Sequence, residues 1–253
     1  MLPVGFCQHI IKTPTLKLSD KEKIKMALSI SIGKAVAEEA YFSASVIARQ
    51  AFNVTVSGGS GTVTIYANST TNDKAFNLGT ISGGAGTKSV TITSVYGTSS
   101  NRKITVVDGA NNSASIIVGV WFKGDISTFS VSGGTPACGA SGIPSNFAAL
   151  PATGLCGEDL VIANPGTGQS ATAVVWDVGP WVPYRNCSAD PYWNTGTVPF
   201  AQQHKDEKRC GLCSCPVGAT DYKINGAILD VSSSVLSSVG ASGTLTNGVW
   251  RFT

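Results

Sequence analysis

Residues 52–120 contain five short runs in which apolar and polar side chains alternate, and this period of two restricts the fold more than any other feature. The runs cover residues 52–56, 63–67, 90–92, 104–106 and 116–120. Glycine-rich clusters such as Ser57-Gly-Gly-Ser-Gly61 lie between them. Alternation places the apolar residues on one face of a strand, and such clusters are typical of tight turns. We therefore predict a small antiparallel β-sandwich over residues 51–125, immunoglobulin-like in broad terms, acting as a spacer or adhesive module.

The composition agrees with a mainly β protein and argues against two kinds of partner. Twenty-nine of the 253 residues are glycine and only 13% are charged, which favours many turns and about two domains. The net charge of +3 is small, and no cluster of Lys and Arg is interleaved with aromatic residues, so we expect no nucleic-acid partner. No run of about 18 apolar residues occurs, so we expect no membrane-spanning helix.

Residues 1–50 are predicted to form an arm and a helix for docking or oligomerisation. Residues 1–18 show no firm period and suggest an extended arm, whereas Ser19-Asp-Lys-Glu22 has the form of a capping box. Apolar residues then recur four apart from Ile24 to Ala40, which predicts an amphipathic helix reaching about Gln50. Its apolar stripe must pack within the chain, on a second copy or on a larger assembly, and these alternatives stay open.

Seven cysteines are present, and six of them lie in the second half of the chain. An even number suits three disulfides, with a weak preference for a bridge across the first loop, from Cys138 to Cys156. The alternative is a tetrahedral zinc site formed by the last four. The six disulfide candidates are Cys138, Cys156, Cys187, Cys210, Cys213 and Cys215.

The seventh cysteine, Cys7, lies in the arm and is a candidate for a disulfide to another chain. Cysteine density of this kind is typical of an oxidising compartment, yet the first residues lack the pattern of a secretory signal. A protein that leaves the cell in a virus particle, released when the host lyses, would reconcile the two observations.

After a Ser/Gly/Thr-rich linker at residues 126–136, two acidic residues follow predicted strands. Residues 172–181 run Thr-Ala-Val-Val-Trp-Asp-Val-Gly-Pro-Trp, which favours a buried strand that delivers Asp177 to its end. Asp230 follows Ile-Leu and precedes residues with helical spacing that stop at Gly240. Each has an alternative structural role, Asp177 in a turn and Asp230 as a helix N-cap.

The order of motifs over about residues 135–253 resembles the double-psi β-barrel of the rare lipoprotein A, expansin and barwin-like families. The motifs are a start rich in small residues, Phe147-Ala-Ala-Leu-Pro151, an Asp before Gly-Pro, an Asp before a short helix, and the closing strand Gly248-Val-Trp-Arg-Phe252. The resemblance implies a six-stranded double-psi barrel over residues 137–253, with Asp177 and Asp230 at the two acidic positions of the family. There these positions serve glycan cleavage in some members and non-hydrolytic wall binding in others.

A pair of carboxyl groups can divide the work of glycan cleavage. The less solvated group keeps its proton and donates it to the glycosidic oxygen, while the other activates water or steadies a positive charge. Aromatic rings in the insertion at residues 181–225 suit the apolar faces of sugars, whereas Trp176 is expected to point into the core. The predicted glycan-binding residues are Trp181, Tyr184, Tyr192 and Trp193.

Three functions follow from the sequence. The first is a bacteriophage virion protein, in the tail or another exposed appendage, that docks on other virion proteins through its arm and helix and binds cell-surface glycan or peptidoglycan. The second is a glycan hydrolase or lytic transglycosylase that uses Asp177 and Asp230. The third is a structural decoration protein linked by disulfides. We expect location in the virion, or alternatively outside the cell, an oligomeric state within an assembly, and no cofactor or metal.

Overall fold

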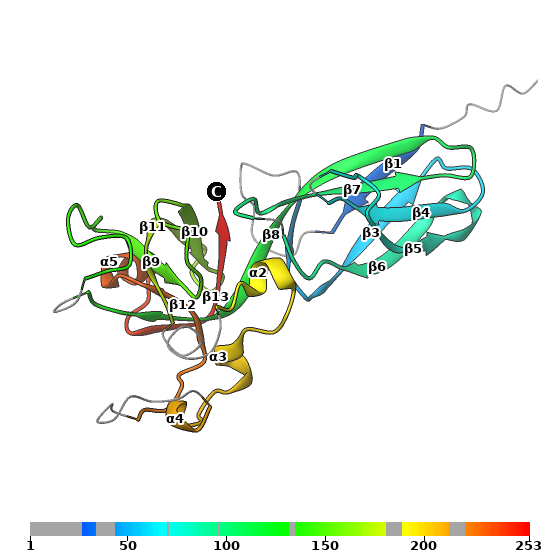
Figure 1. The fold of residues 1–253 in the computed structure, drawn as a ribbon. Helices are drawn as coiled ribbons and strands as arrows, with labels where there is room; N and C mark the ends of the chain where they lie inside the picture. The colour runs from blue at the N-terminus through cyan, green and yellow to red at the C-terminus, as the bar shows by residue number, and fades with distance from the viewer. Residues whose placement is uncertain are drawn as a thin grey trace, which may run out of the picture.

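A computed structural model describes residues 27–33, 44–69, 71–95, 97–131, 135–180, 189–212 and 221–253. Strands dominate this part of the chain, so the prediction of a mainly β protein is confirmed. Figure 1 shows two β regions side by side, a small sandwich and a barrel, with the long strand β8 running from one into the other. The described helices have at most six residues, and none of them has the length and apolar character needed to cross a membrane.

Two sheets form the sandwich. The first has the order β1-β3-β6, and in the second β5, β4, β7 and β8 follow one another, with β2 pairing in parallel with β8. Their bounds are β1 Ser29–Ile32, β2 Ala44–Ile47, β3 Ala51–Ser57, β4 Val63–Ala67, β5 Phe76–Ile81, β6 Gly86–Thr91, β7 Asn101–Val107 and β8 Ser113–Thr128, with a short 3-10 turn at Ser82–Gly84.

The sandwich core comes from the alternation seen in the sequence. In β3 every second residue is buried, and the inward residues of β4 and β7 are likewise buried. Each buried Val or Ile contributes about 1.5–3 kcal/mol through removal of apolar surface from water. Two of the glycine-rich turns touch, because Gly59 donates its N–H to the carbonyl oxygen of Gly84 at 2.9 Å. A Cβ on Gly59 would lie 2.5 Å from that oxygen, so a larger residue does not fit there.

The described part of residues 1–50 forms strands, so the predicted helix is wrong where it can be compared. Ser29–Ile32 pairs antiparallel with β3, and Ala44–Ile47 is buried beside β8. Ser29-Ile-Ser-Ile32 also alternates with a period of two, and pairing with existing strands satisfies its backbone while burying β-branched side chains. The arm, the capping box and Cys7 lie outside the described residues.

Strand β8 belongs to both the sandwich and the barrel. Its first half pairs with β7, and its second half pairs with β13 and β12. The predicted linker at residues 126–136 is therefore wrong over residues 126–128, which form the end of this strand. The barrel accordingly begins within β8, before residue 137.

The barrel is closed by six strands in the order β8-β13-β10-β11-β9-β12, with β12 returning to β8. The pairs β11–β9 and β12–β8 are parallel and the others are antiparallel. The further bounds are β9 Phe147–Leu150, β10 Asp159–Asn164, β11 Gln169–Val178, β12 Ala227–Val231 and β13 Thr244–Phe252. Inward residues such as Ile126, Leu160 and Leu229 are fully buried and fill its interior.

The insertion between β11 and β12 packs against both regions. Its short helices are α2 Tyr192–Thr195, α3 Phe200–Gln203 and α4 Arg209–Leu212. The Tyr192 hydroxyl donates to the carbonyl oxygen of Ile228 at 2.9 Å and accepts from the indole N–H of Trp250 at 3.0 Å. The carbonyl oxygen of Trp193 accepts from the amide of Val95, in the sandwich, at 2.7 Å. Aromatic burial thus ties the insertion to the barrel and to the end of the sandwich.

Candidate functional site

The two predicted acids, Asp177 and Asp230, lie in one row across three neighbouring strands. Asp177 on β11 and Asp230 on β12 are both paired with Ala149 on β9, which runs between them. Two strand spacings place their Cα atoms about 10 Å apart. The next strand on the side of Asp230 is β8, where Ser127 is paired with Asp230. Directly paired residues share a face of a sheet, so these side chains belong to the same outer surface of the barrel.

A β-bulge puts Asp177 in this row. The register between β11 and β9 shifts between Val175 and Asp177, so Asp177 instead of Trp176 stands opposite Ala149. A bulge of this kind redirects a side chain. Trp176 is partly exposed, and its indole N–H donates to the carbonyl oxygen of Gly139 at 3.1 Å, so the prediction that it points into the core is wrong.

Asp177 is held by the main chain. Asp177 is only 8% exposed. Its Oδ1 atom accepts hydrogen bonds from the amides of Ala137 at 2.9 Å and Val178 at 2.8 Å. Amide hydrogen bonds to a carboxylate are strong and fix its orientation. Asp177 therefore lies within β11 and anchors the segment at Ala137 to the end of this strand, as well as standing in the row of acids.

Asp230 has a different environment. It is partly buried and accepts a hydrogen bond from the Ser127 hydroxyl. Burial raises the pKa of Asp230 to about 6, and the bond from Ser127 opposes this rise only in part. The helix that follows, α5 at Ser233–Ser238, has Ser232 at its N-cap position, so the alternative role of Asp230 as the N-cap is wrong.

Ser127 is itself positioned by a third side chain. Asn225 Nδ2 donates to Ser127 Oγ at 3.2 Å, while Asn225 Oδ1 accepts from the amide of Ala227 at 2.9 Å. The second bond fixes which end of the amide faces Ser127. A hydrogen-bonded chain thus runs from Asn225 through Ser127 to Asp230.

A polar groove adjoins this chain along β8. Lys123, Asp125 and Ser127 occupy alternate positions and therefore share the outer face of the strand. The first two line a groove of about 470 Å³ between the turn after β2, the end of the barrel and the segment around α3. Other side chains that line it are Arg49, Gln50, Gln202, Lys205 and Asn247.

The charged groups of the groove are fixed by defined contacts. Lys205 Nζ lies 3.0 Å from Asp125 Oδ2, and this hydrogen bond raises the pKa of Lys205. Asp125 Oδ1 also accepts from the amide of Asn247 at 3.3 Å. Arg49 Nη1 donates to the carbonyl oxygen of Thr197 at 2.7 Å, and burial lowers the pKa of Arg49. The groove offers donors and acceptors in a preset arrangement, which is what recognition of a polar ligand requires.

Two of the predicted glycan-binding rings are core residues. Tyr192 is 0% exposed and Trp193 is 1% exposed, and both pack edge-to-face against Trp250. The prediction that they form a surface for sugars is therefore wrong, since neither ring presents a face to solvent. Trp181 and Tyr184 lie outside the described residues.

The preferred disulfide is present. Cys138 and Cys156 are bonded, with Cα atoms 5.5 Å apart. The bridge holds the segment that contributes the Ala137 amide to Asp177, because Cys138 also donates its amide to the carbonyl oxygen of Trp176 at 3.2 Å. The disulfide therefore supports the acid row at the end of β11.

The remaining cysteines bear on the zinc alternative. Cys210 is also disulfide-bonded, so it has no thiolate to offer, and the four-cysteine zinc site loses a ligand. Cys187, Cys213 and Cys215 lie outside the described residues. Within the described ranges, no group of three or more His, Cys, Asp and Glu side chains is placed to hold a metal ion.

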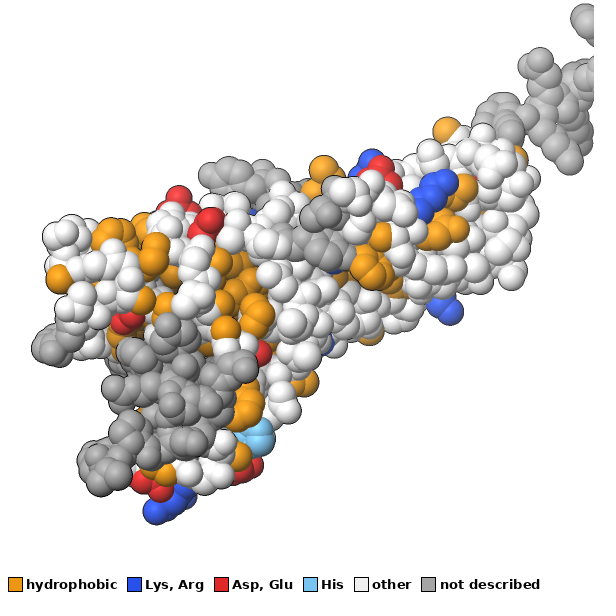
Figure 2. Space-filling view, viewed as in Figure 1, with side chains coloured by type: hydrophobic (Ala, Val, Ile, Leu, Met, Phe, Trp, Pro, Cys, Tyr) orange, Lys and Arg blue, Asp and Glu red, His pale blue; other side chains and the backbone are white. Residues whose placement is uncertain are grey.

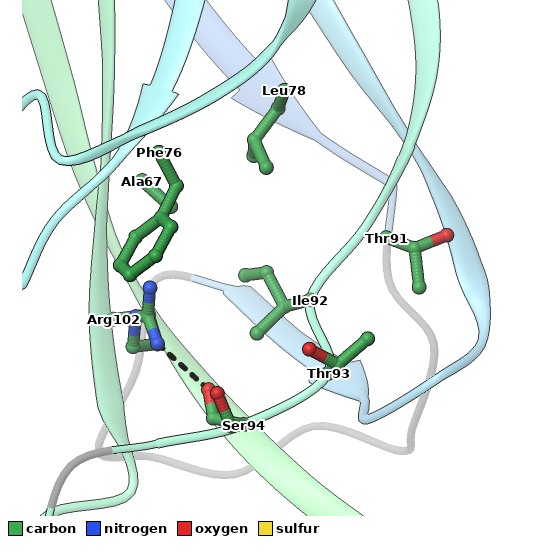
Figure 3. Close-up of a pocket in the computed structure, with 8 residues that line it drawn as sticks. All are labelled: Ala67, Phe76, Leu78, Thr91, Ile92, Thr93, Ser94 and Arg102. Carbon is green, nitrogen blue, oxygen red and sulfur yellow. Dashed lines mark hydrogen bonds between the residues drawn. The ribbon is translucent and has the colours of Figure 1, made fainter. Parts of the chain in front are cut away.

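A second hollow, in the sandwich, has a structural explanation. Figure 3 shows Phe76 beside the guanidinium of Arg102, with Ile92 and Leu78 nearby. These side chains line a space of about 120 Å³. Arg102 is 3% exposed and donates to the carbonyl oxygens of Ser94 and Asn68 at 2.8 and 2.7 Å. Arg102 on β7 thus links this strand to the segments at Asn68 and Ser94.

Several residues of the groove and of the adjoining Asn225–Ser127–Asp230 chain were not predicted from the sequence. Lys123, Asp125 and Ser127 carry a signal, because they continue in β8 the alternation that begins in the sandwich. Arg49, Lys205 and Asn225 carry none, since the fold alone brings them to the barrel. On the face shown in Figure 2, basic side chains are scattered instead of gathered in one patch.

Comparison of the chain with protein-family models, with curated proteins and with solved structures gives no match.

Proposed function

We propose that the barrel binds a glycan along the outer face of β8, in the groove beside Asp125 and over the Ser127–Asp230 pair. The observation that carries this proposal is the groove itself, lined by carboxylate, amide and basic side chains. Ser127, which is bonded to Asn225 and Asp230, lies two residues beyond Asp125 on the same face of β8. Sugars present many hydroxyl groups, and amides and carboxylates bond hydroxyls in defined directions. The motif order shared with expansin-like families supports the same ligand class.

Binding is favoured over cleavage by the state of Asp177. One of its oxygens is occupied by two main-chain amides and the residue is nearly buried, so it is better suited to holding the strand end than to activating water. A closed six-strand barrel with two parallel pairs is compatible with the double-psi topology, which remains part of the proposal.

Glycan cleavage is the second candidate function, and Asp230 is the observation that favours it. A carboxyl group with a pKa of about 6 keeps its proton in mildly acidic solution and can donate it to a glycosidic oxygen. The bond between that oxygen and the anomeric carbon would break, and the leaving sugar would keep the proton of Asp230 as a hydroxyl group. Water would add to the anomeric carbon and pass a proton to the carboxylate of Asp177. Release of reducing ends from peptidoglycan and polysaccharides tests this, and Asp230→Asn should slow a genuine reaction by at least about 100-fold.

The proposed setting is an appendage of a bacteriophage virion, with location outside the cell as the alternative. The cysteine-rich second half of the chain and the wall-binding resemblance support it. Docking on other virion proteins through residues 1–50 is part of this proposal. Detection of the protein in purified particles, with its crosslinked neighbours identified by mass spectrometry, tests the setting independently of the glycan.

Cell-wall pull-down and a polysaccharide array test the proposed ligand. The wild type should bind one or more glycans, and the double variant Gln50→Ala and Gln202→Ala should bind them about tenfold more weakly, because it loses two amides that line the groove. Gln169→Ala is the matched control, since this exposed residue at the start of β11 does not line the groove. Absence of binding to every wall and glycan would leave a purely structural role.

A further inference from the structure

The groove beside β8 brings together three basic side chains from separate parts of the chain. Arg49 belongs to the turn after β2, Lys123 lies on β8 and Lys205 follows α3. Among the described lining residues, Asp125 is the one carboxylate. The lining therefore carries three positive charges and one negative charge, in a chain whose overall net charge is only +3.

The single lining carboxylate neutralises one of these cations. Lys205 is paired with Asp125 at 3.0 Å. Lys123 lies two residues before Asp125 on β8. Among the described residues, the other two cations of the lining, Arg49 and Lys123, form no ion pair.

Arg49 is placed to face a ligand. Its Nη1 is bonded to the carbonyl oxygen of Thr197, and a guanidinium has five N–H donors, so further donors remain for a bound group. Asp190 lies close enough to favour the charged form of Arg49, but it is outside the lining, and its Oδ2 accepts from the amide of Phe200 at 2.7 Å. The cationic character of the groove wall is therefore retained.

We infer that the groove selects glycans that carry an acidic group, and that Arg49 and Lys123 bind this group while the neighbouring amides bind sugar hydroxyls. This inference rests on the proposed function and names its substrate class. The shared chemistry is an anion attached to a sugar, either the carboxylate of a uronic acid or a phosphate. A guanidinium and an ammonium in the lining of one groove suit such a group better than a neutral hydroxyl.

The test compares each acidic glycan with its own neutral form. Acidic polysaccharides, one uronate-bearing and one phosphate-bearing, are assayed by isothermal titration calorimetry with the full chain. The uronate polymer is assayed again after its carboxyl groups have been converted to amides, and neutral polysaccharides complete the set. The acidic form should bind at least about tenfold more tightly than the amide form, and added salt should reduce this preference.

Two variants and a control assign the preference to residues. Lys123→Gln and Arg49→Gln should each reduce the preference for the acidic form by about fivefold or more. Lys88→Gln removes an equal charge from β6 of the sandwich and should change nothing. Lys123→Gln is the primary variant, because Arg49 also supports the Thr197 carbonyl and its replacement alters a structural contact. Circular dichroism checks that each variant is folded.

The outcomes separate the two proposals. Binding of neutral glycans alone, equal binding of acidic and amidated forms, or a preference unaffected by both variants would overturn the acidic selectivity and leave the glycan proposal standing. Binding of none of the glycans would remove both. Tighter binding of a single-stranded oligonucleotide than of any glycan would show that the anion is that of a nucleic acid, which would also overturn the inference.

Discussion

Ser127 donates its hydroxyl hydrogen to the carboxyl group of Asp230, and the two residues face each other across the parallel pair of β8 and β12. The bond joins a strand shared with the sandwich to a strand that belongs to the barrel alone. Because burial outweighs this bond, the pKa of Asp230 lies at about 6 instead of 3.8.

The stability of the protein should therefore depend on Asp230 between pH 4 and pH 7. The folded state binds the proton more tightly than the unfolded state, so the contribution of this group is most favourable below pH 3.8 and is lost as the pH rises through 6. The difference corresponds to about 3 kcal/mol. Urea unfolding at pH 4.5 and pH 8 should show Asp230→Asn gaining stability relative to the wild type at the higher pH. An equal difference at both values would contradict the assigned pKa.

Replacement of Asp177 should destabilise the protein whether or not a glycan is bound. Asp177→Ala leaves the amides of Ala137 and Val178 without their acceptor, which costs about 2–4 kcal/mol. Asp177→Asn keeps an oxygen and should cost less. Thermal unfolding measures both, with Asp73→Ala as a control on an exposed acid of the sandwich. Equal losses in the two Asp177 variants would argue against the amide contacts.

Loss of the Cys138–Cys156 bridge should lower the free energy of unfolding by about 3 kcal/mol, as the crosslink closes a short loop in the unfolded chain. The double variant Cys138→Ser and Cys156→Ser is compared with the wild type by urea unfolding without reductant. A non-reducing peptide map should recover the two peptides as a linked pair. Alkylation of both thiols in the native protein would refute the bridge.

Tyr192 should matter for folding and not for glycan binding. Tyr192→Phe removes a hydroxyl that bonds both Ile228 and Trp250 in the core, and it should cost about 1–3 kcal/mol. Affinity for any glycan should stay unchanged below the melting temperature, since the ring is fully buried. A selective loss of affinity in a stable Tyr192→Phe protein would restore the idea of a sugar platform.

Local patterns predicted the parts of the fold that depend on neighbours in sequence. The alternation around Val54 and Val56 gave the sandwich, and the short separation of Cys138 from Cys156 suited their bridge. The helix prediction failed because Ile32 fits two patterns, the spacing of four that runs from Ile24 to Ala40 and a period of two with Ile30. Pairing with β3 decides between them, and this pairing is a tertiary contact.

Of the residues of the candidate site, only Asp177 and Asp230 were predicted from the sequence. Asp177 lies in the row because of a β-bulge, and no residue type in the sequence predicts this bulge. Ser127 contacts Asp230 only through the tertiary fold, because the two residues are about a hundred positions apart in the sequence. Tyr192 and Trp193 were misplaced because aromatic residues beside prolines suit an exposed loop as well as a buried anchor. Their position depends on packing against Phe122 and Trp250, which are distant in the sequence.

The continuity of β8 has a mechanical consequence. Since one unbroken backbone runs from the ladder with β7 into the ladders with β13 and β12, tension applied to either region reaches the other through covalent bonds. A load along this strand acts on many hydrogen bonds in shear at once, instead of opening them one by one. A force on a ligand held by the barrel is therefore transmitted to the sandwich along β8.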